Sequence, residues 1–230
     1  MGCYPKPADN SLSRIIAGSD TTSTAIAATL FYLVRHPESL ARVTSEVRSA
    51  FSSLEDIHIG EALNSCTFLR ACIDEAMRLS PSVGGILPRQ VLPGGMTIDG
   101  EHIPAGMIVG TPHYTIHHNP AYYPEPFSFK PERWIGEEAK VKAAKRAFCP
   151  FSIGSRGCIG KGLAYVEMSI TIARVLWMYD MRRAVGVQDP AEGGPERGVW
   201  GRHRKEEFQL VDTFTSWKEG VMVEFRKRDV

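Results

Sequence analysis

The sequence predicts a mainly α-helical chain with small β-sheets (α+β). Long segments repeat apolar residues every three or four positions and stop at prolines, a pattern typical of helices. Between residues 83 and 112, glycine and proline bracket runs of three to five residues, which indicates short strands and hairpins. Near the C-terminus apolar and polar residues alternate, which favours another hairpin over residues 207–226.

The composition is that of an ordinary globular domain, with 230 residues of which 43% are apolar, 23% charged and 9% aromatic. This length fits one domain or part of a larger one. The 27 basic and 26 acidic residues leave a formal charge of +1, so no whole-chain field favours nucleic acid as a partner. The five cysteines are odd in number and lack paired CxxC spacing, which argues against a disulfide framework or a four-cysteine zinc site.

The first predicted helix covers residues 11–36. Ser11 or Ser13 would cap its start, and the pair His36-Pro37 would end it. The segment around Gly18 consists mostly of poor helix formers. Tertiary packing must therefore stabilise the beginning of this helix.

Three more helices follow from apolar stripes along the chain. Pro37 would begin a second helix that reaches Phe51, because proline is favoured in the first helical turn. A third helix is predicted over residues 65–79 and ends before Pro81. The last is predicted over residues 159–178, where apolar residues follow one another at spacings of three and four.

The segments between these helices are predicted to be less regular. Residues 83–112 would form a short β-sheet region in which Asp99-Gly100 is the clearest turn. Residues 118–150 are rich in proline and aromatic residues and lack periodicity, so we expect an irregular meander. Long irregular segments inside a compact domain are more often functional than mere connections.

The C-terminal region combines an irregular segment with the predicted hairpin. Residues 186–205 are rich in glycine, proline and charge, and we predict that they are mobile. The alternating runs near 208–212 and 221–225 would pair with each other. Residues 214–217 would lie near the tip of that hairpin.

A glycine-rich segment, residues 151–160, reads Phe-Ser-Ile-Gly-Ser-Arg-Gly-Cys-Ile-Gly. Its three glycines let the backbone approach a flat ligand closely. Cys158 lies just before the last helix, where unpaired N–H groups and the helix dipole favour a thiolate, as a metal ligand or a nucleophile. Arg156 adds a cation suited to a carboxylate. Cys158 alone is more typical of a buried cysteine in a glycine-rich turn, but chance agreement of the whole pattern is on the order of 10⁻⁴ or lower.

This segment resembles the haem-ligating loop of cytochrome P450 monooxygenases. The resemblance implies a haem b cofactor whose iron is bound axially by the Cys158 thiolate. It places four further loop residues at the cofactor: Phe151, Gly154, Arg156 and Gly160. It also implies that residues 1–230 form a single partial domain, the C-terminal haem-binding part of the P450 fold.

The sequence Glu75-Ala-Met-Arg78 is similar to the ExxR pair of the same family. A spacing of three places both side chains on one helical face, although an exposed ion pair would have the same spacing. The resemblance adds Arg133, in the segment Pro131-Glu-Arg-Trp134, as the third member of a structural triad. The triad would fasten the meander beneath the haem and serve folding and haem retention.

Residues 17–22, Ala-Gly-Ser-Asp-Thr-Thr, are similar to the family's oxygen-activation motif. Gly18 removes a side chain where dioxygen would approach. Thr21 can donate a hydrogen bond to a preceding carbonyl and open the helix to water, through which Asp20 could relay protons. A packing site of small residues with a cap-like cluster is the alternative interpretation.

Further contacts are implied by the resemblance alone. Arg89 would bind a haem propionate, although it also fits a plain edge-strand arginine. Residues 15–16, 83–87 and 214–217 match places where the family contacts substrate, and each fits a hydrophobic core equally well.

Two other groups of residues carry weaker signals. His113 and His117 have a spacing that can bind zinc on a helix, but no third ligand accompanies them, so structural histidines are favoured. The second group is a basic run that comprises Lys140, Lys142, Lys145 and Arg146. It could attract an acidic electron-transfer partner, or it could be a solvated loop without such a role.

The resemblance implies a monooxygenase that inserts one atom of O2 into a small organic substrate, lipophilic or a secondary metabolite. Asp20 and Thr21 would be catalytic, and NADPH-cytochrome P450 reductase would supply electrons. A full-length parent would lie on the cytosolic face of the endoplasmic reticulum membrane, to which only an N-terminal anchor would attach it. The alternatives are a truncated, inactive haem-binding remnant, a thiolate-haem enzyme for rearrangement or peroxide chemistry, and a non-haem thiol protein.

Overall fold

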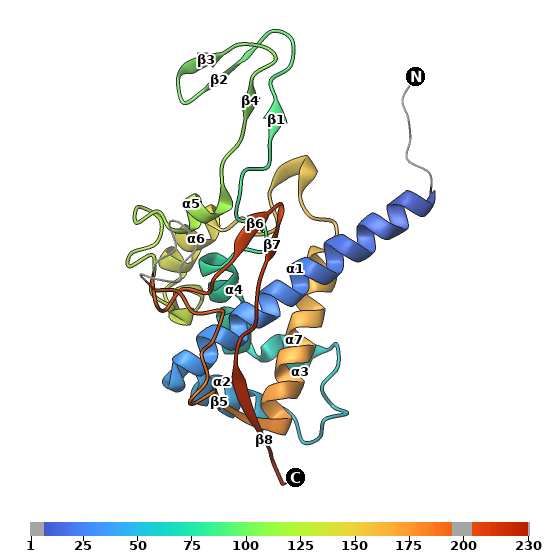
Figure 1. Cartoon of the computed structure of the whole chain (residues 1–230), viewed down its shortest axis with the longest axis vertical. Coiled ribbons are helices and arrows are strands. Elements are labelled where there is room, and N and C mark those ends of the chain that lie inside the picture. Colours follow the sequence, from blue (N-terminus) through green and yellow to red (C-terminus); the bar gives the residue numbers. More distant parts are fainter. Residues whose placement is uncertain (1–6, 195–203, 230) are drawn as a thin grey trace.

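The computed structural model describes residues 7–194 and 204–229, with side chains from residue 15 onward. Helices dominate, accompanied by small antiparallel sheets, which confirms the predicted α+β class. The long helix α1 (Pro7–Arg35) crosses the molecule diagonally, and α4 (Thr67–Leu79) and α7 (Lys161–Met178) pack against it (Figure 1). None of the described helices is both long and apolar enough to span a membrane.

The helices agree with the apolar stripes, while several ends differ. Helix α1 begins at Pro7 rather than at Ser11 or Ser13, because proline is itself tolerated in the first turn. Helix α2 (Pro37–Ala50) starts at the predicted proline. The short helix α3 (Glu61–Ser65) was not predicted, and α7 begins two residues later than the predicted residue 159.

The hydrophobic core lies where these helices meet. Helix α4 is buried on nearly every side, from Phe68 to Leu79. Fully buried side chains from α1, α2 and α7 pack into the same cluster; they include Phe31, Leu33, Val43, Val47, Ile172 and Leu176. Burial of each large aliphatic or aromatic side chain contributes about 1.5–3 kcal/mol, which stabilises the C-terminal half of α1. Residues 15–20, which include the poor helix formers around Gly18, are exposed, so the expectation that packing stabilises the beginning of this helix was wrong for them.

A β-arm projects from the helical body (Figure 1). In it, β1 (Arg89–Gln90) pairs with β4 (Ile108–Val109), and β2 (Met96–Ile98) pairs with β3 (Glu101–Ile103). The turn between β2 and β3 has positive φ at both central residues, Asp99 (50°) and Gly100 (86°), as a tight hairpin requires. The predicted turn is confirmed.

The C-terminal strands pair differently from the prediction. Strands β6 (Val211–Thr213) and β7 (Thr215–Trp217) form a short hairpin around Phe214, whose φ is 80°. Strand β8 (Val223–Lys227) pairs instead with β5 (Tyr179–Arg183), which directly follows α7. The prediction that residues 208–212 pair with 221–225 was wrong, because alternation identifies a strand but not its partner.

The segment 118–150 is more regular than predicted. It contains the 3-10 turn η1 (Pro131–Trp134) and helix α6 (Glu138–Ala147), and helix α5 (His113–His117) precedes it. The basic run therefore lies on a helix rather than in a loop. Ala144 and Ala147 of α6 are buried against the aromatic residues of the segment, so tertiary packing stabilises a short helix that lacks a clear stripe. Of the predicted mobile segment 186–205, residues 195–203 lie outside the described residues.

Candidate active site

A buried ion pair lies at the C-terminal end of α4. Arg78 donates to both carboxylate oxygens of Glu75, from Nε to Oε2 and from Nη2 to Oε1, each at 2.9 Å. Both side chains are fully inaccessible to solvent. Since a surface pair at this spacing contributes only a few tenths of a kcal/mol, burial is what distinguishes this pair from the exposed alternative.

Arg78 also connects α4 to the meander. Its Nη1 donates to the carbonyl oxygens of His117 (2.8 Å) and Pro126 (2.7 Å), and its Nη2 donates to that of Ser128 (3.2 Å). All five N–H groups of the guanidinium are thereby paired. An irregular segment is thus fixed by one side chain that satisfies its carbonyl groups.

Glu75 receives donors from the other side of the meander. Its Oε1 accepts the Lys130 backbone N–H (2.9 Å) and Nε of Arg133 (3.1 Å), and its Oε2 accepts Nε1 of Trp134 (3.0 Å). The structure therefore brings Glu75, Arg78 and Arg133 together as the sequence predicts. Trp134 was not predicted as a partner, although it directly follows Arg133 and its indole N–H requires an acceptor when buried.

A second polar link joins α4 to α7, the helix that follows the glycine-rich loop. Tyr165 donates from its hydroxyl to Oδ1 of Asp74 at 2.8 Å, and the guanidinium of Arg70 lies 3.2 Å from the Tyr165 ring centroid. Burial raises the pKa of the Asp74 carboxyl, while the charge of Arg70 opposes the shift. These contacts fix the position of α7 relative to α4.

The glycine-rich loop holds Cys158 on the surface. The Cys158 N–H donates to the carbonyl oxygen of Phe151 at 2.8 Å, which closes the loop, and the Cys158 side chain is exposed. Phe151 packs on Tyr165, with ring centroids 5.0 Å apart, so it anchors the loop to α7. Gly160 immediately precedes α7, and a Cβ there would meet the Cys158 Sγ at 3.8 Å.

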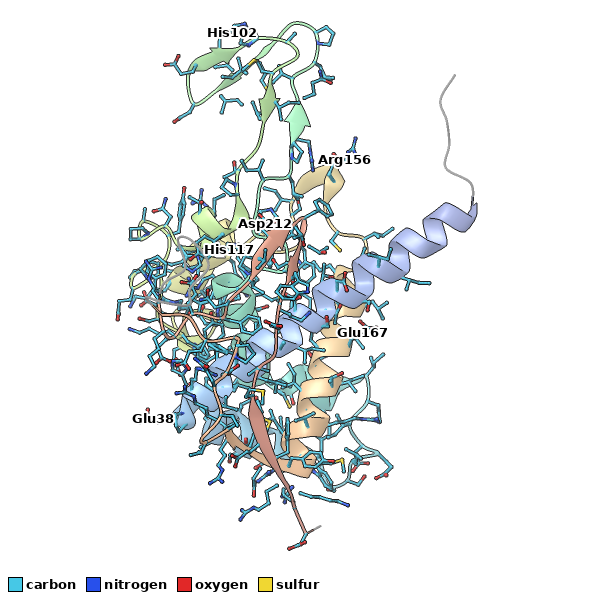
Figure 2. All side chains as sticks on the ribbon, in the orientation of Figure 1. Glu38, His102, His117, Arg156, Glu167 and Asp212 are labelled. Carbon is cyan, nitrogen blue, oxygen red and sulfur yellow. The ribbon has the colours of Figure 1, made fainter. Side chains whose placement is uncertain are left out.

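The surroundings of Cys158 fit a haem. The side chains of Ile153, Ile159 and Leu163 are exposed at 76%, 100% and 65%, which gives the thiol an apolar border. Arg156 in the loop (Figure 2) and Arg89 at β1 form no ion pair with any described residue, so both are available to carboxylates. A soft thiol donor, an apolar face and two guanidinium groups without acidic partners are the chemistry that a haem with its propionates requires.

Gly154 is the loop residue whose replacement has a predictable cost. Its φ is 73°, and a Cβ built on it would meet nothing within 4 Å. We expect Gly154→Ala to lower the free energy of unfolding by about 1–2 kcal/mol, because only the backbone conformation is strained. Urea unfolding measures this. Gly162→Ala, in the first turn of α7 and equally free of steric contacts, is the matched control and should be neutral or slightly stabilising; equal losses in both variants would contradict the prediction.

The predicted oxygen-activation motif forms one turn of α1. The Thr21 hydroxyl donates to the carbonyl oxygen of Ala17 at 2.6 Å, as predicted from the sequence. A Cβ placed on Gly18 would meet no other atom within 4 Å, so the space beside this glycine is open. Ser82 donates from Oγ to the Thr21 carbonyl oxygen at 2.7 Å and so fastens this turn to the segment after α4. Within the described part of the chain, no hydrogen bond joins this turn to the Cys158 loop.

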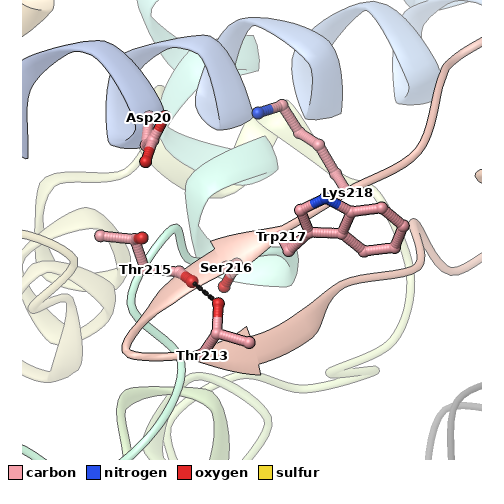
Figure 3. Close-up of a pocket in the computed structure, with 6 residues that line it drawn as sticks. All are labelled: Asp20, Thr213, Thr215, Ser216, Trp217 and Lys218. Atoms are coloured by element: carbon pink, nitrogen blue, oxygen red, sulfur yellow. Dashed lines mark hydrogen bonds between the residues drawn. The ribbon is translucent and has the colours of Figure 1, made fainter. Parts of the chain in front are cut away.

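The segments predicted to contact substrate each carry exposed apolar side chains, although Gly84 and Ser216 within them are buried. The exposed apolar side chains are those of Ile15, Ile16, Ile86, Phe214 and Trp217. The β6–β7 hairpin faces α1 across a pocket that also contains Asp20 (Figure 3). The structure thus places the hairpin tip beside the predicted proton-relay residue, and it adds Lys218, which sequence analysis missed although it follows the tip directly.

The two histidines of α5 are buried and packed. Nε2 of His117 accepts the Cys149 N–H at 3.0 Å, and its ring lies 6.2 Å from that of His113. Burial lowers the pKa of His117 to about 3, so the ring is neutral. The described residues contain no cluster of three or more groups that could hold a metal ion.

Comparisons with known proteins identify the family. The cytochrome P450 family model matches residues 8–202. A cytochrome P450 monooxygenase of Alternaria alternata is 50% identical over 220 residues, which cover 93% of this chain and 42% of that relative. A cytochrome P450 monooxygenase of Gibberella zeae is 48% identical over 222 residues, 96% of this chain and 51% of the relative. The chain therefore spans about half the length of the curated relatives it matches.

The family match includes the main parts of the site but not the β6–β7 hairpin. Residues 8–202 contain the Asp20–Thr21 turn, the Glu75–Arg78 pair and the Cys158 loop. The resemblance to this family stated from the sequence is confirmed. The chain belongs to the cytochrome P450 family.

Proposed function

We propose that this chain is the haem-binding and oxygen-activating part of a monooxygenase that inserts one atom of O2 into a small, lipophilic organic substrate. The observation that carries the proposal is the exposed Cys158 thiol, held in a glycine-rich loop whose arginine, Arg156, forms no ion pair with a described residue. Haem bound there supplies a thiolate-ligated iron, and the electron donation of that ligand favours O–O cleavage.

The residues of this chain would have separate roles in haem binding, in structural support and in proton transfer. Cys158 binds the iron, while Arg89 and Arg156 pair with the propionates and hold the porphyrin in one orientation. The Glu75–Arg78–Arg133 cluster keeps the meander in place. Asp20 and Thr21 hold and pass protons at one turn of α1, beside the pocket that contains the hairpin.

The remaining parts of the proposal rest on the family. A secondary metabolite is the proposed substrate class, and NADPH-cytochrome P450 reductase the proposed electron donor. The basic residues on the surface of α6, Lys140, Lys142, Lys145 and Arg146, would attract the reductase electrostatically. The cytosolic face of the endoplasmic reticulum is the proposed location.

The absorption spectrum tests this function directly. The haem-loaded protein, reduced and exposed to CO, should show the red-shifted Soret band of a thiolate-ligated iron, and NADPH with reductase should drive product formation. A thiolate spectrum without turnover would favour an inactive haem-binding remnant. A nitrogen-ligated spectrum, or no bound haem, would overturn the proposal.

Thr21→Val tests the proposed proton delivery. Valine keeps the shape of threonine but removes the hydroxyl that contacts the Ala17 carbonyl. We expect product per NADPH to fall about tenfold or more, because a positioned proton donor typically contributes a factor of 10²–10⁴. Thr29→Val is the matched control: the buried Thr29 makes the same contact to Ala25 at 2.7 Å, away from the pocket. An equal effect of both variants would indicate a general helix defect instead.

A further inference from the structure

The glycine-rich loop, residues 151–160, is attached to the hydrophobic core through one side chain. Phe151 is half-buried and packs against the core, whereas the two other large apolar side chains of the loop, Ile153 and Ile159, are exposed. The Phe151 carbonyl oxygen also accepts the Cys158 N–H at 2.8 Å. The position of Cys158 therefore depends on the contacts that hold Phe151.

The ring on which Phe151 packs belongs to Tyr165, in the second turn of α7. The two ring centroids are 5.0 Å apart and the ring planes are inclined at 47°, within the range in which aromatic pairs attract each other. Tyr165 is buried, and burial raises the pKa of its hydroxyl, so the hydroxyl keeps its proton. A buried tyrosine hydroxyl requires a hydrogen-bond partner, and the identity of that partner fixes the direction of the ring.

Asp74 of α4 is the acceptor for this hydroxyl. Its Oδ1 accepts the Tyr165 O–H at 2.8 Å, and both of its carboxylate oxygens lie 3.3 Å from Nε of Arg70. Arg70 also covers one face of the Tyr165 ring, with its guanidinium carbon 3.2 Å from the ring centroid. The tyrosine ring is thus held by a carboxylate at its hydroxyl, by a cation on its face and by the packing of Phe151.

Asp74 directly precedes Glu75, so α4 supports both irregular segments of the site. Glu75 and Arg78 hold the meander by hydrogen bonds to its backbone. Asp74 reaches the cysteine loop through two side chains, Tyr165 and Phe151. The second connection consists of side-chain contacts alone, and single substitutions can interrupt it without changing the loop sequence.

We propose that Tyr165 and Asp74 are positioning residues for Cys158: the hydrogen bond between them holds the ring on which Phe151 packs and thereby keeps the cysteine loop closed. The consequence for the iron rests on the proposed function, in which the Cys158 sulfur is the ligand. Removing the groups that orient a metal ligand typically changes metal affinity or activity by a factor of about 10–100. A hydrogen bond that only joined α4 to α7 would leave the loop unchanged, and this difference can be measured.

Hydrogen exchange of the Cys158 amide in the haem-free full chain measures loop closure without a cofactor. Tyr165→Phe removes only the hydroxyl, and we expect this amide to exchange about three- to tenfold faster, the range expected for the loss of one hydrogen bond. Tyr32→Phe is the matched control, because the buried Tyr32 hydroxyl lies 2.8 Å from the Ser80 Oγ and not at the loop. It should leave the Cys158 amide unchanged. Unchanged exchange in Tyr165→Phe, or equal acceleration in both variants, would overturn the proposal.

Two variants of Asp74 separate the hydrogen bond from the charge. Asp74→Asn removes the charge but keeps an oxygen that can accept the Tyr165 O–H, so it should retain most of the protection of the Cys158 amide. Asp74→Leu removes the acceptor and should resemble Tyr165→Phe. The double variant Asp74→Leu with Tyr165→Phe should be little worse than either single variant, because both remove the same contact. Additive effects, or an asparagine variant as impaired as the leucine variant, would contradict the proposal.

The reduction potential of the haem-loaded protein extends the test to the iron. A loosened loop admits water to the sulfur, and hydrogen bonds to the sulfur weaken its electron donation. We therefore expect a more positive midpoint potential in Tyr165→Phe than in Tyr32→Phe, by about threefold or more in the equilibrium constant of the one-electron reduction. Faster exchange at Cys158 with an unchanged potential would overturn the role toward the iron. Absence of a thiolate spectrum in the unmodified protein would instead count against the proposed function, while the exchange experiment would still decide whether the pair holds the loop.

Discussion

Replacing Cys158 by alanine should abolish both the thiolate spectrum and NADPH-dependent product formation. The iron would lose its only sulfur ligand from the loop, and with it the electron donation that favours O–O cleavage. Because the side chain is exposed, the substitution removes no core packing, so the free energy of unfolding of the haem-free chain should change by less than about 0.5 kcal/mol. Absorption spectra of the reduced CO complex and urea unfolding together test this combination.

Cys149→Ala is the matched control for this experiment. Cys149 lies just before the glycine-rich loop, but it is partly buried with its Sγ 3.7 Å from Nε2 of His117, and burial raises the pKa of its thiol. We expect its alanine variant to keep the red-shifted Soret band. Loss of the band in Cys149→Ala, with retention in Cys158→Ala, would reverse the assignment of the ligand.

Replacing Arg78 by methionine is expected to have the largest effect on stability. Removing one partner of a buried ion pair costs about 3–5 kcal/mol, because the remaining charge is left buried and unpaired. Here the carbonyl groups of His117, Pro126 and Ser128 would lose their donor as well. Since a whole domain is stable by only about 5–15 kcal/mol, we expect most of the protein to be unfolded or insoluble.

A second substitution keeps this prediction testable. Combining Arg78→Met with Glu75→Gln removes the unpaired charge, so the double variant should be more stable than Arg78→Met alone, as measured by the urea midpoint. Arg42→Met is the surface control: the Arg42–Glu132 pair is more than half exposed on both sides, and its loss should cost about 1 kcal/mol or less. Equal losses for Arg42 and Arg78 would show that burial does not govern the effect.

The site was predictable wherever its residues are neighbours in sequence. Glu75 and Arg78 are three residues apart on one helix, and the glycine-rich loop and the Ala17–Thr22 turn are contiguous segments, so local geometry defines each of them. Arg133 and Arg89 required the family resemblance, because no local rule relates them to Glu75 or to Cys158. The roles of Asp20, Arg89 and Arg156 remain predictions, and Thr21→Val tests that of Thr21.

The elements that the sequence did not predict depend on partners far along the chain. Helix α6 has no clear stripe and forms because Ala144 and Ala147 pack against the aromatic meander. Strand β8 pairs with β5 rather than with residues 208–212. Strand β5 directly follows α7, so the fold of the helices places it beside β8. Each of these outcomes follows from packing rather than from propensity.

The sequence by itself determined helices α1, α2, α4 and α7, the tight turn of the β-arm, the glycine-rich cysteine loop and the spacing of the ion pair, because each follows from residues a few positions apart. Only the tertiary structure decided which carbonyl groups receive the five donors of Arg78, and that Lys218 reaches the turn of Asp20. Buried donors must find acceptors wherever folding places them. Those acceptors come from distant segments, and no local pattern identifies them.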